Sequence, residues 1–375
     1  MNLAIVISRY HRGAGLERVA VEYARGLRAR GHDITVFARD VTVEADDEPI
    51  RFTHVPAPGQ IALRAATFPL AASRAVARAE PFDNIIAFGS VMTMPAVVRA
   101  PGVHRSWFEF ANREWPVGSV AGVKRRLNPH HRIVLGWDRY VLGGGRARAV
   151  LAAGAWQADD IRRFYPKVAD RVQVLADGVN LDEFAFDAEV RARRRANWGV
   201  GDVPVVLAVV TEIRRKGIGG LFDAFAHILR REPRARLVVA STAPADQVRA
   251  LAHQAGVTEA LGPVGFVPDM RAAYAASDLL LFPTRFDTWG LPVVEALACG
   301  TPVVVSARAG AATVVRPGES GAVVIDPTDP HAVAEAALEV LARRWDRDAL
   351  RAAVEHLSWD RIVGQLDAIV EATAS

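Results

Sequence analysis

Residues 285–296 have the sequence Arg-Phe-Asp-Thr-Trp-Gly-Leu-Pro-Val-Val-Glu-Ala and follow the apolar run Leu-Leu-Leu-Phe at 279–282. This order predicts a strand, a loop that contains a glycine turn, and a helix with Pro292 in its first turn. The start of such a helix offers backbone N–H groups and the positive end of the helix dipole to a phosphate. Asp287 and Glu295 add two carboxylates that can accept hydrogen bonds from sugar or ribose hydroxyls.

Short β-rich runs alternate with helical segments along most of the 375 residues, which is typical of parallel α/β sheets. The first series begins with a strand at 3–8, a helix at 16–30 and a strand at 34–38. The second series runs from a strand at 204–210 to a strand at 322–325. Two doubly wound, Rossmann-like domains facing across a cleft fit this pattern, with ligands beyond the carboxyl ends of the strands.

The composition excludes several classes of protein. Hydrophobic residues make up 51% of the chain, but no run is long enough for a membrane helix, and the first residues lack the basic region of a secretory signal. The single cysteine, Cys299, predicts a buried structural thiol. A net charge of +4 with sparse aromatic residues permits anionic partners but does not indicate nucleic acid. The carboxylate pairs Asp46-Asp47 and Asp159-Asp160 lack the context of a metal site, and we expect neither a metal nor a cofactor.

The stretch 285–296, continued by Leu297–Val305, resembles the E-x7-E motif of retaining glycosyltransferases of family 4, which have the GT-B fold. Asp287 stands where the family has its first Glu. The resemblance implies that Glu295 holds the ribose of a nucleotide-sugar and that Asp287 contacts the sugar, while Gly290 and Leu291 lie against the diphosphate. Taken singly, the two carboxylates also fit an ordinary loop aspartate and a solvated helix glutamate.

Two further motifs match the diphosphate-binding groups of this family. Arg215 and Lys216 follow a predicted strand, and guanidinium and ammonium groups can stabilise the charge of a leaving diphosphate. A basic surface loop is the alternative. The resemblance implies that the Gly13–Gly15 turn covers the donor phosphates. A dinucleotide site would need glycine where Arg18 stands.

The family resemblance implies roles for three more residues. Phe266 and Val267 match the strand and turn beside the nucleobase. His104 follows an apolar residue, as in many family members, and is our third candidate catalytic residue beside Asp287 and Glu295, positioning the sugar or the reaction centre. A structural or surface histidine is the alternative.

The family pattern also implies the domain limits. We expect an acceptor-binding domain at 1–180, a nucleotide-sugar-binding domain at 181–357, and a C-terminal helix at 358–375 that returns to the N-terminal domain. The basic run Arg191–Arg195, which follows the turn-rich segment 177–184, is expected to be a solvated helix face.

Basic residues lie among apolar ones in segment 118–137, at Lys124, Arg125, Arg126 and Arg132. This pattern predicts either a patch that contacts an anionic membrane or an ordinary exposed helical face. Peripheral membrane contact would suit a lipid-linked acceptor, with the protein in the cytoplasm or on the inner face of the cell membrane.

The sequence therefore predicts a retaining glycosyltransferase that moves a hexose from a nucleotide-sugar donor to a glycolipid or a cell-surface glycan precursor. UDP-glucose is the first expectation for the donor, and GDP-mannose and UDP-N-acetylhexosamines are the alternatives. A small natural product is the second acceptor class. A nucleotide-sugar epimerase and a non-catalytic nucleotide-sugar-binding subunit are the other functions to be weighed.

Overall fold

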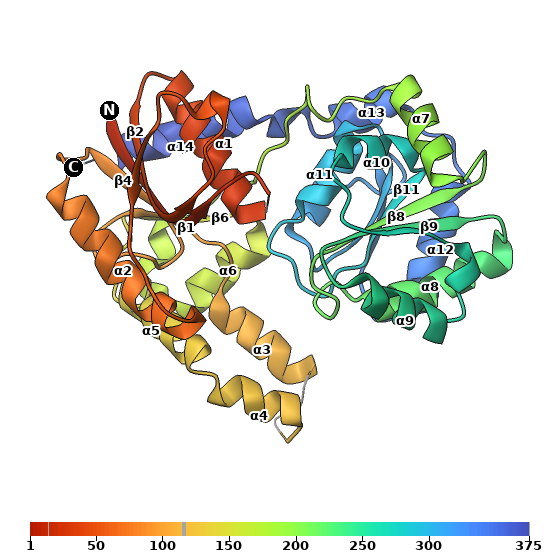
Figure 1. The fold of residues 1–375 in the computed structure, drawn as a ribbon, viewed down its shortest axis with the longest axis horizontal. Helices are drawn as coiled ribbons and strands as arrows, with labels where there is room; N and C mark the ends of the chain where they lie inside the picture. Colours follow the sequence, from red (N-terminus) through yellow and green to blue (C-terminus); the bar gives the residue numbers. More distant parts are fainter. Residues whose placement is uncertain (14, 115–117, 375) are drawn as a thin grey trace. The chain divides into compact units, whose positions relative to one another are not determined.

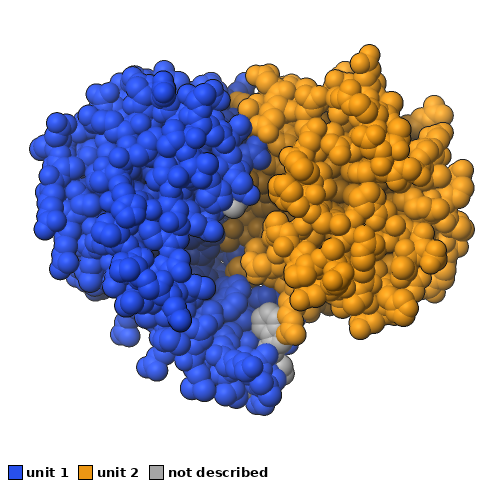
Figure 2. Space-filling view, viewed as in Figure 1, with its two compact units in different colours: residues 1–177, 359–375 blue, residues 178–358 orange. Residues whose placement is uncertain are grey.

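The computed structural model describes residues 1–13, 15–114 and 118–374, which form two compact α/β units (Figure 1). Unit 1 contains residues up to Asp177 together with those from Trp359 onward, and unit 2 contains Gly178–Ser358 (Figure 2). Each unit has one parallel sheet with helices packed against it. The predicted α/β class with two Rossmann-like domains is confirmed.

Unit 1 is built on a seven-stranded sheet with the order β3-β2-β1-β4-β5-β6-β7. Its strands are β1 (Asn2–Tyr10), β2 (Asp33–Val41), β3 (Arg51–His54), β4 (Asn84–Phe88), β5 (Val97–Arg99), β6 (Ala149–Ala152) and β7 (Val172–Val174). Its helices are α1 (Gly15–Ala29), α2 (Ile61–Arg78), α3 (His104–Glu114), α4 (Val120–Leu127), α5 (Pro129–Val141), α6 (Ala155–Phe164) and α14 (Trp359–Ala372), with short 3-10 turns at Ala45–Asp47 and Pro166–Arg171. The central strands β4 and β6 are buried throughout, as expected for a parallel sheet covered on both faces.

The C-terminal helix α14 packs against α1 and belongs to unit 1. The rings of Tyr23 and Trp359 lie 6.3 Å apart, and Arg30 Nη2 donates to Asp360 Oδ1 at 2.8 Å. A Cβ atom on Gly26 would lie 2.7 Å from a methyl group of Val363. The glycine therefore allows the two helices to approach each other closely.

Unit 2 has a six-stranded sheet with the order β10-β9-β8-β11-β12-β13. Its strands are β8 (Val205–Val210), β9 (Arg236–Ser241), β10 (Leu261–Gly265), β11 (Leu279–Phe282), β12 (Val303–Ser306) and β13 (Gly321–Val324). Its helices are α7 (Ala188–Trp198), α8 (Ile218–Arg231), α9 (Ala245–Gln254), α10 (Met270–Ala276), α11 (Leu291–Ala298), α12 (Pro330–Leu341) and α13 (Arg347–Ala352), with 3-10 turns at Thr258–Ala260, Gly310–Val314 and Glu355–Leu357. Phe222, Phe225 and Ile228 on one face of α8 pack into the core of this sheet.

The basic run on α7 differs from its predicted role as a solvated face. Arg195 is only 8% exposed and donates to the carbonyl oxygens of Ala276 at 2.8 Å and Gly201 at 3.0 Å. Arg191 Nη2 donates to Asp278 Oδ1 at 2.6 Å. The prediction is wrong for these two residues, because Ala276 and Asp278, more than 80 positions away in the sequence, accept hydrogen bonds from them.

Candidate active site

Two loops leave the carboxyl ends of neighbouring strands in unit 2. Residues 211–217 follow β8 and residues 283–290 follow β11, which pairs with β8 in the sheet. Two hydrogen bonds join the loops: the Arg285 N–H donates to the Arg215 carbonyl at 3.0 Å, and Arg215 Nη1 donates to the Phe286 carbonyl at 3.2 Å. The sheet therefore holds Arg215 beside the segment that carries Asp287.

Lys216 and Asp287 form an ion pair in the interior of this cluster. The two residues are 9% and 8% exposed, and Lys216 Nζ lies 4.5 Å from the centroid of the Phe282 ring. Burial alone would raise the pKa of Asp287, but Lys216 and Arg215 outweigh it and hold that pKa below its usual range, so the residue is a carboxylate. Asp287 thus fixes the ammonium group of Lys216, a contact that the sequence analysis did not predict.

The start of α11 has the geometry that its sequence predicts. Gly290 is the N-cap residue with φ of +105°, which favours glycine, and Pro292 lies in the first turn. A Cβ atom at Gly290 would also come within 3.1 Å of the Phe282 ring. Leu291 is the first helical residue, so its N–H points out of the helix end, where an anion is favoured.

Glu295 is the fifth residue of α11 and is only 6% exposed. The hydroxyl of Tyr274 on α10 donates to Glu295 Oε2 at 2.7 Å, and Tyr274 is itself fully buried. The sequence analysis missed Tyr274. A tyrosine within the alanine-rich stretch of α10 was the available signal, because a buried phenol needs a hydrogen-bond partner.

One donor of Arg215 has no acceptor. Its Nε atom is buried and lacks a hydrogen-bond partner within the described part of the chain, and the same holds for Trp289 Nε1. An unpaired buried donor costs about 1–3 kcal/mol, so such atoms are uncommon unless an acceptor is supplied from elsewhere. Hydrogen bonding around Lys216 and Asp287 is therefore incomplete at these two enclosed donors.

Phe266 and Val267 follow β10, at the same carboxyl edge of the unit 2 sheet as the cluster. β10 is the edge strand, and β9 separates it from β8. The Phe266 side chain is 75% exposed, so its ring is accessible to a ligand.

Three predicted residues lie in unit 1, whereas Arg215, Lys216, Asp287, Gly290, Leu291 and Glu295 are gathered in unit 2. Gly13 follows β1, and its N–H donates to His11 Nδ1 at 3.0 Å. Gly15 is the first residue of α1, and Ala14 between them lies outside the described residues. His104 is the first residue of α3, at the carboxyl end of β5.

His104 belongs to a cluster of aromatic and imidazole rings. Its Nε2 atom lies 3.1 Å from His131 Nδ1, and its ring stacks on Trp107 with the centroids 5.4 Å apart. Burial, with the nearby His131 and His130, lowers the pKa of His104 to about 4. The imidazole is therefore neutral at pH 7 and can exchange hydrogen bonds but not supply positive charge.

The cysteine is buried, as predicted, at the end of α11. Burial raises the pKa of the Cys299 thiol, so it remains protonated and unreactive at neutral pH. Among residues 1–13, 15–114 and 118–374, no three His, Cys, Asp or Glu side chains are grouped so as to hold a metal ion.

Known proteins resemble both units. Residues 203–343 match the family model for glycosyl transferases group 1, and residues 13–183 match the model for glycosyltransferase family 4. A D-inositol 3-phosphate glycosyltransferase of Xylanimonas cellulosilytica is 30% identical over 324 residues, covering 76% of this chain and 74% of the relative.

A shorter match is a GDP-mannose-dependent alpha-(1-6)-phosphatidylinositol monomannoside mannosyltransferase of Mycolicibacterium smegmatis, 31% identical over 207 residues, 49% of this chain and 53% of the relative. The solved structure of WaaG, a glycosyltransferase involved in lipopolysaccharide biosynthesis, is similar with a TM-score of 0.81 at 21% identity, covering 98% of this chain and 99% of that one. These matches and the two parallel sheets identify the chain as a member of glycosyltransferase family 4 with the GT-B fold.

Proposed function

We propose that this protein is a retaining glycosyltransferase that moves a hexose from a nucleotide-diphosphate sugar to a hydroxyl group of a glycolipid or cell-surface glycan precursor. The observation that carries the proposal is the buried Lys216–Asp287 pair, held beside Arg215 at the end of β8 and β11. A nucleoside diphosphate gains negative charge as the glycosidic bond breaks. Cations fixed at that point stabilise the transition state without reorganisation.

Each residue of the cluster has a distinct part in this proposal. Arg215 and Lys216 bind the diphosphate oxygens, together with the Leu291 N–H at the start of α11. Glu295 accepts hydrogen bonds from the ribose hydroxyls, and Tyr274 holds its other oxygen. Asp287 pairs with Lys216 and fixes its ammonium group in place.

The acceptor hydroxyl attacks from the face that the diphosphate leaves, which retains the anomeric configuration. The departing diphosphate can take the hydroxyl proton, so the step requires no enzyme nucleophile. The proposal includes no metal and no cofactor, because the cations of the chain and the helix dipole balance the charge of the diphosphate. His104, as a neutral imidazole, positions the sugar by hydrogen bonding.

UDP-glucose is the proposed donor, and GDP-mannose is the main alternative, because one relative is by name GDP-mannose-dependent. A panel of UDP-glucose, UDP-N-acetylglucosamine and GDP-mannose, each assayed for free nucleoside diphosphate with a lipid acceptor extract, identifies the donor. NMR of the product then gives its anomeric configuration. We expect one donor to release its diphosphate and the configuration to be retained.

Three other outcomes would each contradict part of the proposal. An inverted product would overturn the retaining mechanism. Conversion of the donor sugar without diphosphate release would indicate an epimerase. Binding without turnover of any donor would indicate a non-catalytic subunit. As an internal control, Glu295→Ala should lose activity while the exposed substitution Arg344→Gln retains it.

We also propose that α4 brings unit 1 to an anionic membrane, which suits a lipid-linked acceptor. Val120, Val123 and Leu127 recur at helical spacing and are 71%, 46% and 75% exposed. Lys124 and Arg126 are exposed beside them. Figure 1 shows α4 away from the sheet of unit 1. An apolar stripe flanked by cations fits the boundary between lipid headgroups and acyl chains.

The alternative for this segment is an ordinary exposed helical face, and one part of the predicted patch differs from the structure. Arg125 is 8% exposed and its Nη2 atom donates to Asn112 Oδ1 at 2.7 Å, so it is not available to lipid. Every helix in the described part of the chain is too short or too polar to cross a membrane.

Cosedimentation with vesicles tests the membrane proposal. Binding to phosphatidylglycerol-containing vesicles should exceed binding to pure phosphatidylcholine vesicles and should fall at high salt. Leu127→Asp should weaken binding at least about tenfold, since it removes apolar area and adds a like charge. Ile325→Asp, at an exposed apolar residue of unit 2, is the matched control. Equal binding of both variants and the wild type would refute the role of α4.

A further inference from the structure

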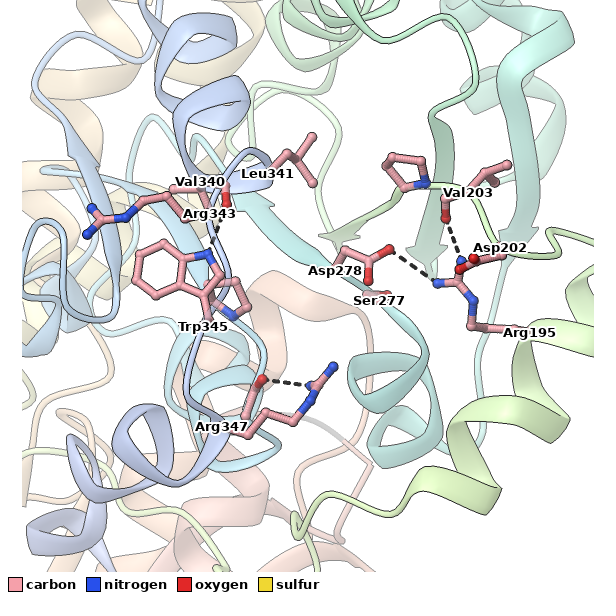
Figure 3. A pocket seen from close by; sticks show the side chains of 13 residues that line it. Arg195, Asp202, Val203, Ser277, Asp278, Val340, Leu341, Arg343, Trp345 and Arg347 are labelled. Atoms are coloured by element: carbon pink, nitrogen blue, oxygen red, sulfur yellow. Dashed lines mark hydrogen bonds and ion pairs between the residues drawn. The ribbon is translucent and has the colours of Figure 1, made fainter.

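A cavity that the proposed reaction does not use lies at the amino ends of the strands in the unit 2 sheet. The cavity has a volume of about 300 Å³ and is lined by Pro204, Asp278 and Pro302, just before the amino ends of β8, β11 and β12 (Figure 3). The candidate active site lies at the carboxyl ends of these same strands. Because a parallel sheet has one carboxyl edge, the two sites are on opposite ends of unit 2.

The cavity wall carries three arginines, Arg195, Arg343 and Arg347, and two carboxylates, Asp202 and Asp278, so positive charge exceeds negative charge. Asp278 accepts hydrogen bonds from Arg191 Nη2 at 2.6 Å, from Arg195 Nη1 at 3.2 Å and from the Val205 N–H at 2.8 Å. One carboxylate therefore serves two guanidinium groups and a backbone amide. Both arginines come from the basic run on α7 that was expected to be solvated.

Arg347 is another of the arginines in the cavity wall. Its Nη1 atom donates to the Gly300 carbonyl at 2.8 Å, and its Cζ atom lies 4.0 Å from the centroid of the Phe186 ring. Within the described residues no carboxylate lies within ion-pair distance of it. Burial lowers the pKa of Arg347, and Arg191 lowers it further against the opposing effect of Asp278. A positive potential thus remains at this arginine.

The rest of the wall includes the indole of Trp345. The Arg343 guanidinium covers one face of this indole, with Cζ 5.1 Å from the ring centroid, so the other face is the one that can take a small ring. Figure 3 shows the indole of Trp345 beside the cavity and the Arg347 guanidinium directed toward the centre of the cavity. The Trp345 Nε1 atom donates to the Val340 carbonyl at 2.8 Å, which fixes the orientation of the indole. The volume is at the lower end of the range for small-molecule sites.

We propose that this cavity is a second binding site, for a small phosphate-bearing ligand whose anion pairs with Arg347 and whose ring packs on Trp345. Guanidinium groups bind phosphate through two parallel hydrogen bonds, and Arg347 has N–H groups beyond the one that Gly300 accepts. Both sugar phosphates and nucleoside monophosphates have this chemistry. The inference stands apart from the proposed glycosyl transfer.

Calorimetry on the intact protein tests the site with three probes: inorganic phosphate, glucose 6-phosphate and UMP. We expect at least one ring-bearing phosphate to bind more tightly than inorganic phosphate, and the tighter probe identifies the source of the ligand. Arg347→Gln should weaken this binding at least about tenfold, and Arg344→Gln, at the exposed neighbour outside the cavity wall, should leave it unchanged.

A further variant keeps the outcome decisive if Arg347→Gln is poorly folded. Arg347→Lys retains a cation but not the fork of guanidinium donors, so it should bind inorganic phosphate more tightly than Arg347→Gln and more weakly than the wild type. The proposal is refuted if none of the three probes binds, or if Arg344→Gln weakens binding as much as Arg347→Gln.

Discussion

The carboxyl edges of the two sheets are alike in architecture and different in charge. In unit 2 the edge holds Lys216 against Asp287 and Glu295 against Tyr274, all four buried. In unit 1 the corresponding edge holds His104, whose ring stacks on Trp107 and His131. Burial opposes charge in both clusters, since it lowers the pKa of Lys216 and that of His104. The Asp287 carboxylate counteracts this effect at Lys216, whereas the neighbouring imidazoles add to it at His104.

This difference fits a division of labour between the units, in line with the proposed reaction. The leaving diphosphate is anionic and requires fixed cations, whereas the hydroxyl groups of the transferred sugar are neutral and are better served by hydrogen bonds and ring surfaces. One parallel architecture can support both because its function lies in the loops after the strands. Substitutions that interchange the two environments test the comparison.

The largest effect is expected when the buried ion pair of unit 2 is broken. Lys216→Met leaves the Asp287 carboxylate buried without its partner, which should reduce the free energy of unfolding by about 3–5 kcal/mol. Loss of the cation should also lower kcat by about 10²–10³-fold. Urea unfolding and release of nucleoside diphosphate measure the two effects.

The double variant Lys216→Met with Asp287→Asn separates stability from catalysis. Removing both charges should restore most of the stability, because a neutral replacement of a buried ion pair is often well tolerated. Activity should remain low, since the cation is still missing. Recovery of activity together with stability would show that Lys216 has only a structural role.

The next effect concerns the pH dependence of stability in unit 1 between pH 4 and 6.5, where Asp138 and His104 contribute with opposite signs. Burial raises the pKa of Asp138 from 3.8 to about 6, although Ser90 and the His104 N–H donate hydrogen bonds to it. The contribution of Asp138 to the free energy of unfolding therefore falls by about 3 kcal/mol as the pH rises through this range. The pKa of His104 is lowered from 6.5 to about 4, so its contribution is present above pH 6.5 and lost as the pH falls.

Urea unfolding at pH 4, 5, 6 and 7 resolves these opposing contributions. Relative to the wild type, Asp138→Asn should become progressively more stable with rising pH, because it removes a carboxyl group that resists ionisation. His104→Gln should become progressively less stable with rising pH, because it removes the gain from the neutral imidazole. Two differences with the same sign would contradict the assignment of this cluster.

Much of the fold and of the candidate site was predictable from local sequence. The apolar runs of β11 and β12 and the glycine and proline around Leu291 specify a strand, a loop and a helix start without reference to the rest of the chain. Parallel strands also share one carboxyl edge, so Arg215 and Lys216 could be predicted to lie near Asp287. β5 was missed because its three residues are too few to show a period.

The pairings within the site could not be predicted in this way. Lys216 and Asp287 are 71 positions apart in the sequence. Their contact depends on the reach of the Asp287 side chain, which is one methylene group shorter than the glutamate that the family has at this position. Tyr274 meets Glu295 only because α10 packs against α11. Arg195 turns inward because the Ala276 carbonyl, 81 positions away in the sequence, and the Gly201 carbonyl, six positions away, accept hydrogen bonds from it. Such contacts follow from tertiary packing, which single-sequence patterns do not contain.

The smallest expected effect concerns the hydrogen bond that holds Glu295. Tyr274→Phe removes a hydroxyl that donates to the carboxylate at 2.7 Å, and a hydrogen bond to a charged group contributes about 1.5–3 kcal/mol. Because Glu295 keeps its charge and can still reach the ribose, we expect the affinity for the nucleoside diphosphate to fall by only about three- to tenfold, with kcat nearly unchanged.

Tyr140→Phe, at a 39% exposed residue of unit 1, is the control and should leave affinity unaltered. A loss of kcat without a loss of affinity would place Tyr274 in the chemical step and would weaken the contrast between a cluster of fixed charges and a cluster of neutral rings.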